Sequence, residues 1–176
     1  MSYLHEVRKQ LLMYKPKNLV DDANVELFNE FLDTERDIFN RKNYEPGHIT
    51  SGGFIVNKER THCVLMHHKK LNRWIQMGGH IENGMSPLAS AEKEVAEESG
   101  LESAKPTGKI HHLGVYIFPE HGDQLEHMHY DLCYLFEADV NEKPKGNDES
   151  SGVRWFTLAE AYQMGDDGVK EMISKL

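Results

Sequence analysis

The sequence predicts a mixed α/β sandwich, in which a mixed sheet lies between helices and is preceded by an N-terminal helical extension. Three observations support this prediction. Apolar residues recur at helical spacing near both ends of the chain, strand-like apolar runs fill the middle, and one capped helix interrupts those runs. A chain of 176 residues favours one domain with a short appendage. We therefore expect the extension at residues 1–43 and the domain at residues 44–176.

The expected elements follow the chain in order. In residues 2–14 apolar residues recur at helical spacing and Pro16 follows as a stop, and residues 21–40 repeat the pattern up to Phe39. Apolar runs bounded by turn residues predict strands at 48–56, 62–68, 110–120, 129–140 and 152–157. Short helices are expected at 158–164 and 168–176.

The helix between the two groups of strands carries an unusual density of carboxylates. Ser86 suits its N-cap and Gly100 suits the residue after its last turn, so the helix is expected over residues 87–99. Three of its carboxylates fall within an arc of about 100°. They are Glu94, Glu97 and Glu98.

An acidic arc of this kind is more often a solvated helix face. Here a strand, the pair Gly78–Gly79 and a loop lead into the capped helix. Hard divalent cations such as Mg²⁺ prefer oxygen ligands. The glycine pair is expected to turn tightly and to bring a backbone carbonyl close to the same ion. This context favours a metal site over a solvated face.

Composition argues against several classes of function. A net charge of −9 at pH 7 disfavours an extended nucleic-acid surface, although a divalent cation would still allow phosphate substrates to bind. Cys63 and Cys133 lie in apolar runs without metal-ligand spacing, which is typical of reduced core thiols in a cytoplasmic protein. No apolar run reaches transmembrane length and no signal-peptide pattern opens the chain, so no membrane partner is expected.

The segment that begins at Gly79 resembles the Nudix box, G-x5-E-x7-R-E-U-x-E-E-x-G-U, where U is apolar. Five residues separate Gly79 from Met85, and seven more lead to Lys93-Glu94-Val95-Ala96-Glu97-Glu98-Ser99-Gly100-Leu101. The flanking pattern extends the resemblance over roughly residues 45–165. The segments GHITSG, KLNRWIQMGGH and HMHYDL resemble a bacterial Nudix group with a helical N-terminal extension.

The resemblance implies a Nudix-like α/β/α sandwich and a pyrophosphohydrolase. Nudix enzymes hydrolyse a nucleoside diphosphate linked to another moiety, by water attack on phosphorus with the help of Mg²⁺ or Mn²⁺. A small nucleotide-type substrate is implied, and catalysis and metal binding are implied for Glu94, Glu97, Glu98 and the Gly79 carbonyl. A catalytic base is implied at Glu149, which precedes Trp155 by six residues, and the alternative there is an ordinary acidic loop.

Two positions depart from the box. Met85 stands where the family has its first glutamate, and Lys93 stands where it has an arginine. Lysine keeps the charge but cannot form the bidentate fork of arginine. The implied metal ligands remain, so activity is expected to be retained. The alternative is a catalytically weak Nudix-fold module that binds a nucleotide.

Histidines form a second candidate site. His127, His129 and Asp131 alternate, so they share one face of the expected strand. His80 follows the glycine pair, and His48 opens the first expected strand. Imidazoles with a carboxylate suit a softer second ion than Mg²⁺, such as Zn²⁺, Mn²⁺ or iron. The alternatives are a phosphate contact and a polar pocket lining. If this face points toward the acidic helix, the histidines are expected near the acidic arc.

The histidines also raise a rival reaction. Isopentenyl-diphosphate isomerase is similar in fold, has a histidine after the glycine of its CGH segment, and has a metal site of histidines and glutamates. Gly78 stands at the position of that enzyme's acid–base cysteine. The isomerase interpretation is therefore the weaker one.

The resemblance leaves residues 1–43 without a role. A Nudix domain is complete without them, and their helices carry an apolar stripe. We expect them to cover one flank of the sheet and either to shape the substrate pocket or to form a homodimer contact.

Overall fold

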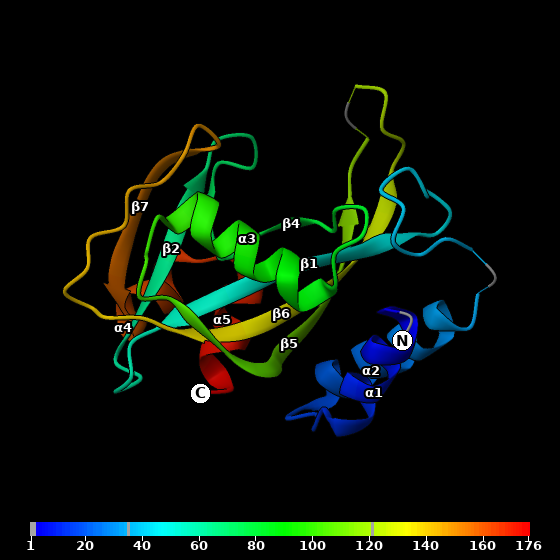
Figure 1. Ribbon diagram of the computed structural model, residues 1–176, viewed down its shortest axis with the longest axis horizontal. Coiled ribbons are helices and arrows are strands. Elements are labelled where there is room, and N and C mark those ends of the chain that lie inside the picture. The colour runs from blue at the N-terminus through cyan, green and yellow to red at the C-terminus, as the bar shows by residue number, and fades with distance from the viewer. Residues whose placement is uncertain (1–2, 35, 121) are drawn as a thin grey trace.

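The computed structural model describes residues 3–34, 36–120 and 122–176 (Figure 1). The strands are β1 (Gly47–Val56), β2 (His62–His68), β3 (Arg73–Ile75), β4 (Met77–His80), β5 (Lys105–Phe118), β6 (His127–Glu137) and β7 (Ser150–Thr157). The helices are α1 (Tyr3–Met13), α2 (Leu19–Leu32), α3 (Pro87–Ser99), α4 (Leu158–Met164) and α5 (Asp167–Ser174). The strands form one seven-stranded sheet in the order β3-β2-β1-β6-β5, with β4 also paired to β1 and β7 to β2.

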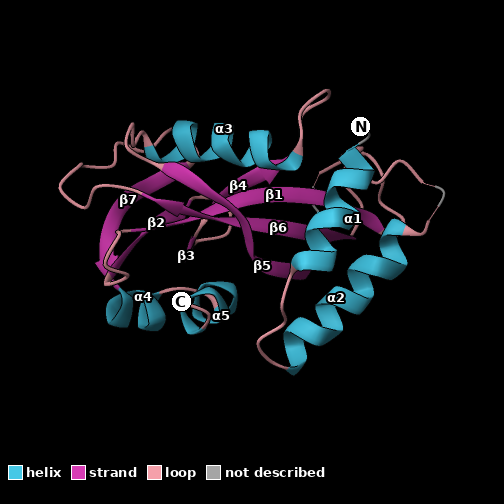
Figure 2. Ribbon diagram, turned by 60° about the horizontal axis from the view of Figure 1, so that its bottom comes forward, coloured by secondary structure: helices cyan, strands magenta, loops and turns pink. Residues whose placement is uncertain are grey.

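Helices cover both faces of this sheet, which confirms the predicted sandwich. α3 lies on one face, and α4 and α5 lie on the other (Figure 2). β1 runs parallel to β6, from the pair Gly47–Met128 to the pair Val56–Glu137. It runs antiparallel to β2 and β4. The sheet is therefore mixed, as the sequence predicts.

α3 has the bounds that the sequence predicts. The Ser86 hydroxyl accepts a hydrogen bond from the Ala89 N–H at 3.2 Å, and Gly100 adopts the left-handed conformation with φ 64°. Gly53 of β1 lies beneath the helix, and a Cβ there would collide with Val95. The missing side chain lets α3 pack closely on the centre of the sheet, with its acidic arc beside β4.

The glycine pair lies in a strand and not in the expected tight turn. Sequence analysis does not predict the short strands β3 and β4. Gly78 pairs with Gly52 of β1, where a Cβ on Gly78 would lie 2.9 Å from the Gly52 Cα. The pair is needed for close approach between neighbouring elements, which corrects the expectation of a turn.

The second helix of the extension is shorter than predicted. α2 ends at Leu32 and does not continue to Phe39. The Ile49 N–H donates a hydrogen bond to the Ile38 carbonyl at 2.8 Å, so the segment after the helix runs beside the start of β1. This contact between distant residues replaces the last turns of the expected helix, and Phe39 packs on the core from a turn.

α1 and α2 lie beside β5 and β6 and share the larger hydrophobic core of the molecule (Figure 2). The ring of Phe31 stacks on that of Tyr130 with the centroids 3.9 Å apart. Asn24 Nδ2 donates a hydrogen bond to the Leu113 carbonyl at 2.8 Å. The extension thus covers one flank of the sheet, while its boundary at residue 43 stays a prediction.

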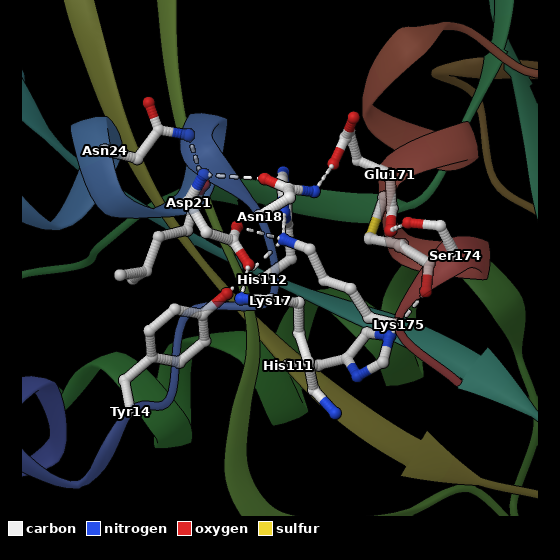
Figure 3. A network of polar contacts seen from close by, with 12 residues as sticks. Tyr14, Lys17, Asn18, Asp21, Asn24, His111, His112, Glu171, Ser174 and Lys175 are labelled. Carbon is white, nitrogen blue, oxygen red and sulfur yellow. Dashed lines mark hydrogen bonds and ion pairs between the residues drawn. The ribbon is translucent and has the colours of Figure 1, made fainter.

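A buried ion pair joins the extension to the end of the chain. Lys175 Nζ contacts the carboxylate of Asp21, and both side chains are buried. The same Nζ contacts Nδ1 of His112 and lies 3.3 Å from the Tyr14 hydroxyl (Figure 3). Burial acts to raise the pKa of Asp21, but hydrogen bonds from Lys175 and from the Lys17 N–H lower it overall. The ion pair therefore ties α2 to the residue after α5.

The face of the sheet under α4 and α5 forms a second core. Cys63 and Cys133 are buried there as free thiols, which confirms their prediction as core residues. Burial raises the pKa of the Cys63 thiol to about 12, so this thiol is inert at neutral pH. Within the described ranges, none of the helices combines the length and the apolar character needed to span a bilayer.

Candidate active site

Glu98 is the most deeply buried carboxylate of the acidic arc. The residue is 1% exposed, and its Oε2 accepts a hydrogen bond from the Gly78 N–H at 2.8 Å. Burial raises the pKa of Glu98 to about 8, the Gly78 N–H acts to lower it, and the charges of Glu94 and Glu149 add to the rise. Glu98 is thus held against β4 among like charges.

Glu94 lies against the next residue of the same strand. A Cβ on Gly79 would lie only 2.8 Å from Oε1 of Glu94. Burial raises the pKa of Glu94, the charge of Lys93 acts to lower it, and Glu97 and Glu149 raise it further. The carboxylate occupies the space that a side chain at position 79 would need, which accounts for the glycine.

Glu97 lies toward solvent and pairs with Lys93. Lys93 Nζ is 2.7 Å from Oε2 of Glu97 and 3.1 Å from Oε1 of Glu82. These hydrogen bonds raise the pKa of Lys93. The lysine ties α3 to the preceding loop, where Met85 supplies no carboxylate. The side chain of Glu97 is 54% exposed, and its role as a metal ligand stays a prediction.

Glu149 acts on the arc from a different segment. It is exposed in the loop between β6 and β7, where its N–H donates to Oδ1 of Asn147 at 3.0 Å and its carbonyl accepts from the Lys69 N–H at 3.0 Å. The charge of Glu149 raises the pKa of both Glu94 and Glu98. The fold therefore places Glu149 close enough for its charge to act on these two carboxylates. Its role as a base stays a prediction.

The arc and the glycine pair together form a donor set that fits a hard divalent cation. The pKa values of Glu94 and Glu98 are raised because both groups are buried and lie near like charges. A divalent cation would favour the ionised carboxylates and would accept oxygen ligands from them and from the Gly79 carbonyl. The residues present fit Mg²⁺ or Mn²⁺.

The second candidate site brings histidines together from three strands. Ligand nitrogens of His48, His80 and His129 all lie within 4.8 Å of one another. Nε2 of His127 lies 3.0 Å from Nε2 of His129. Four of the histidines singled out in the sequence are thus neighbours in the fold, although they come from positions far apart in the chain.

Asp131 belongs to the same face and is positioned by a residue that sequence analysis missed. Its Oδ1 accepts a hydrogen bond from the Thr50 hydroxyl at 2.9 Å, and burial raises the pKa of Asp131 to about 6. In the parallel register, Thr50 pairs with Asp131 as His48 pairs with His129. The sequence contains two patterns of equal spacing, His48-x-Thr50 and His129-x-Asp131. Their alignment could be recognised only once β1 is known to pair with β6.

The histidines and the acidic arc lie on opposite faces of β4. Gly79 pairs with Ser51, whose hydroxyl donates to the Pro87 carbonyl of α3 at 2.7 Å. Side chains alternate along a strand, so the neighbouring pair Thr50 and His80 points to the other face. The histidine face therefore points away from the acidic helix, and β4 lies between the two groups.

Residues 47–176 match the family model described as the NUDIX domain. Among solved structures, an Ap4A hydrolase from C. elegans, in a binary complex, superposes with a TM-score of 0.58 at 14% identity, over 72% of this chain and 93% of that chain. The E. coli dihydroneopterin triphosphate pyrophosphohydrolase gives a TM-score of 0.54 at 11% identity, over 72% and 92%. A NUDIX family hydrolase from Clostridium perfringens gives 0.53 at 17% identity, over 77% and 94%. At these identities the superpositions show a shared fold.

The family match contains the acidic arc, the glycine pair and the histidine face. It begins at the first residue of β1, so α1 and α2 lie outside it. The fold and the residues of the box agree with this match, and the chain belongs to the Nudix family of hydrolases.

Proposed function

We propose that this protein is a metal-dependent pyrophosphohydrolase that cleaves a nucleoside diphosphate linked to another moiety. The observation that carries the proposal is the junction of α3 with β4. There Glu98 accepts the Gly78 N–H, and Glu94 fills the space beside Gly79. A cation at this junction would let phosphate bind although the chain carries a net charge of −9.

Glu94, Glu97, Glu98 and the Gly79 carbonyl would hold Mg²⁺ or Mn²⁺. When bound, such an ion lowers the pKa of a coordinated water and neutralises charge on the phosphoryl group. Burial and the bond to β4 keep the Glu98 carboxylate in one orientation. Lys93 holds the exposed end of the arc against the loop before α3.

Glu149 is the general base of the proposal. It would take a proton from water as the water oxygen bonds to phosphorus and the bridging P–O bond breaks. The products are a nucleoside monophosphate and the phosphorylated moiety. A base must reach the attacking water. Support comes from the charge of Glu149, which already acts on Glu94 and Glu98 across the site.

The proposed substrate is a small nucleotide-type molecule with a phosphoanhydride bond. Two of the structural neighbours are named for Ap4A and for dihydroneopterin triphosphate, and these names support a substrate with linked phosphates. A screen of nucleoside triphosphates, dinucleoside polyphosphates, nucleotide sugars and capped RNA with Mg²⁺ and with Mn²⁺ would identify it.

Glu98→Gln tests the proposal on the best substrate of that screen. We expect kcat to fall at least about a hundredfold, a loss of roughly 2.7 kcal/mol of transition-state stabilisation, in a protein that still folds. Glu92→Gln is the matched control, because Glu92 is exposed on the same helix. Full turnover by Glu98→Gln would refute the assignment.

A nucleotide-binding module is the alternative favoured by Met85 and Lys93, which depart from the box. This alternative predicts nucleotide affinity without turnover under either metal. The isomerase alternative predicts that isopentenyl diphosphate is converted with its diphosphate intact. Gly78 offers no thiol for that reaction, and phosphate release would distinguish a hydrolase from it.

We also propose that the protein is cytoplasmic. Its domain spans residues 44–176 and is preceded by the extension at residues 1–43. Buried free thiols at Cys63 and Cys133 support a reducing compartment. A homodimer contact through the extension would use exposed leucines at the end of α1 and at the start of α2. Leu12 and Leu19 are 88% and 86% exposed. Light scattering after gel filtration would measure the oligomeric state.

A further inference from the structure

We propose that His48, His80 and His129, with His127 as a fourth ligand, form a binding site for a divalent transition metal that is separate from the acidic arc. The three strands β1, β4 and β6 place ligand nitrogens of the first three within 4.8 Å of one another. None of these residues lies in α3. The site goes beyond the hydrolase proposal and does not depend on it.

His48 is arranged to offer a lone pair to a ligand. The residue is 1% exposed, and its Nδ1 lies 3.1 Å from the carbonyl of Asn43. A carbonyl can only accept, so Nδ1 carries the proton and Nε2 of the neutral ring carries the lone pair. Over the residues that the structure describes, this buried Nε2 has no hydrogen-bond partner. Histidines that bind metals commonly donate their other N–H to a carbonyl in this way.

The same arrangement recurs at His127. Its Nδ1 lies 2.6 Å from the carbonyl of Leu125, so the lone pair of the neutral ring is on Nε2. That Nε2 is 3.0 Å from Nε2 of His129. Two nitrogens on one tetrahedral Zn²⁺ lie roughly 3.3 Å apart when each Zn–N distance is about 2.05 Å. The distance between these two Nε2 atoms is therefore close to the distance between two nitrogen ligands of one ion.

Aromatic rings pack beside two members of the cluster. The ring of Phe118 stacks on that of His129 with the centroids 4.9 Å apart, and Tyr44 lies 5.0 Å from the ring of His127. Four imidazoles crowded together in such a place repel one another when protonated. In the neutral form, the buried Nε2 of His48 keeps a lone pair without a partner among the described residues. A bound cation satisfies both conditions.

The chemistry of the donors selects the class of ion and favours a metal over a phosphate. His48 and His127 each place Nδ1 against a backbone carbonyl, so the Nε2 atoms of the neutral rings offer lone pairs and not N–H groups to a ligand. Asp131 adds a buried carboxylate on the same face, beside Thr50. Nitrogen ligands with a nearby carboxylate suit Zn²⁺, and next Mn²⁺ or Fe²⁺, better than Mg²⁺.

Zinc binding by the full chain tests the proposal. The protein is stripped with a chelator, dialysed, and incubated with Zn²⁺ in a large excess of Mg²⁺, which occupies the oxygen ligands of the arc. Elemental analysis after gel filtration should give about one Zn²⁺ per wild-type chain. His129→Gln and the double variant His48→Gln/His129→Gln should bind Zn²⁺ at least about tenfold more weakly.

Two controls separate this site from the rest of the molecule. Glu98→Gln should keep its Zn²⁺ even where it has lost turnover. His67→Gln should also keep it, because His67 is a partly exposed histidine of β2 that bonds to Ser151 outside the cluster. Zn²⁺ should raise the melting temperature of the wild type and of both controls, but not that of His129→Gln.

Several outcomes would overturn the proposal. One is the absence of Zn²⁺ binding by the wild type, and another is full binding by the double variant. A third is loss of Zn²⁺ binding in Glu98→Gln alone, because that result would assign the ion to the acidic arc. Circular dichroism checks the fold of each variant. If the double variant fails to fold, His80→Gln replaces it, because His80 is only partly buried. Unchanged Zn²⁺ affinity in a folded His80→Gln would count equally against the site.

Discussion

Glu98 of α3 accepts a hydrogen bond from the backbone N–H of Gly78 in β4 at 2.8 Å. This bond joins the acidic helix to the strand that carries His80 on its other face. The next residue of the strand, Gly79, leaves the space in which Glu94 lies. The two carboxylates thus depend on the backbone of β4 for their positions, and a small change in that strand should disturb the site before it disturbs the fold.

Gly79→Ala tests this dependence. The added Cβ would lie 2.8 Å from Oε1 of Glu94 and would displace a flexible side chain. We expect kcat/KM to fall by roughly ten- to a hundredfold, since a displacement of about 1 Å at a reacting centre has effects of this size. Gly152→Ala is the control, because its Cβ would meet only Trp74, at 3.8 Å. Equal kinetics for the two variants would contradict the prediction.

The buried pair of Asp21 and Lys175 should show strong coupling. Asp21→Asn leaves the ammonium of Lys175 without its carboxylate, and removal of one partner of a buried pair destabilises by about 3–5 kcal/mol. Lys175→Met should be similarly harmful. The double variant should be less destabilised than the sum of the single variants, because it leaves neither charge unpaired. Urea unfolding of the four proteins measures this, and additive losses would show that the pair is not coupled.

His112 should make the protein less stable in mild acid. Burial lowers its pKa to about 3, and the charge of Lys175 adds to the shift. The unfolded chain takes up a proton near pH 6.5, whereas the folded chain does not do so until about pH 3. The unfolded state binds more protons in this range, so the free energy of unfolding falls as the pH drops from about 6.5 toward 3.

His112→Gln should remove part of that pH dependence. The expected change is up to about 1.4 kcal/mol per pH unit, which corresponds to one proton. Urea unfolding of the wild type and the variant at several values between about pH 7 and 5 measures the two slopes. Identical slopes would mean that His112 is protonated equally in the folded and unfolded states.

Local signals in the sequence predicted the elements that depend on local physics. α3 begins and ends as expected because Ser86 caps it and Gly100 adopts the left-handed conformation that ends it. β4 was missed because two of its four residues are glycine, and it forms only through its pairing with β1. α2 ends at Leu32, and the segment after it is held beside β1 by the bond between Ile38 and Ile49, which no local pattern encodes.

The same distinction applies to the site. Helical spacing alone placed Glu94 and Glu98 on one arc, and strand alternation alone placed His127 and His129 on one face. Which face of the sheet each group occupies depends on the parallel pairing of β1 with β6 and on the side that α3 covers. These are tertiary facts, so the sequence left open whether the histidines lie beside the arc, and the fold places them across the sheet from it.

The N-terminal extension should behave as part of one cooperative unit, because its helices share a core with the sheet. Phe31 is 2% exposed and stacks on Tyr130, so Phe31→Ala should lower the free energy of unfolding by about 3–5 kcal/mol. Leu27→Ala is the control on the same helix, where the residue is 40% exposed and the loss should stay below about 1 kcal/mol. Both variants should melt in a single transition by circular dichroism.

Deletion of residues 1–43 should destabilise the protein more than Phe31→Ala, because it uncovers Tyr130 and leaves Lys175 without Asp21. We expect the truncated chain to aggregate or to change its oligomeric state in gel filtration. A truncated chain with unchanged mass distribution, melting temperature and activity would show that the extension is a separate appendage.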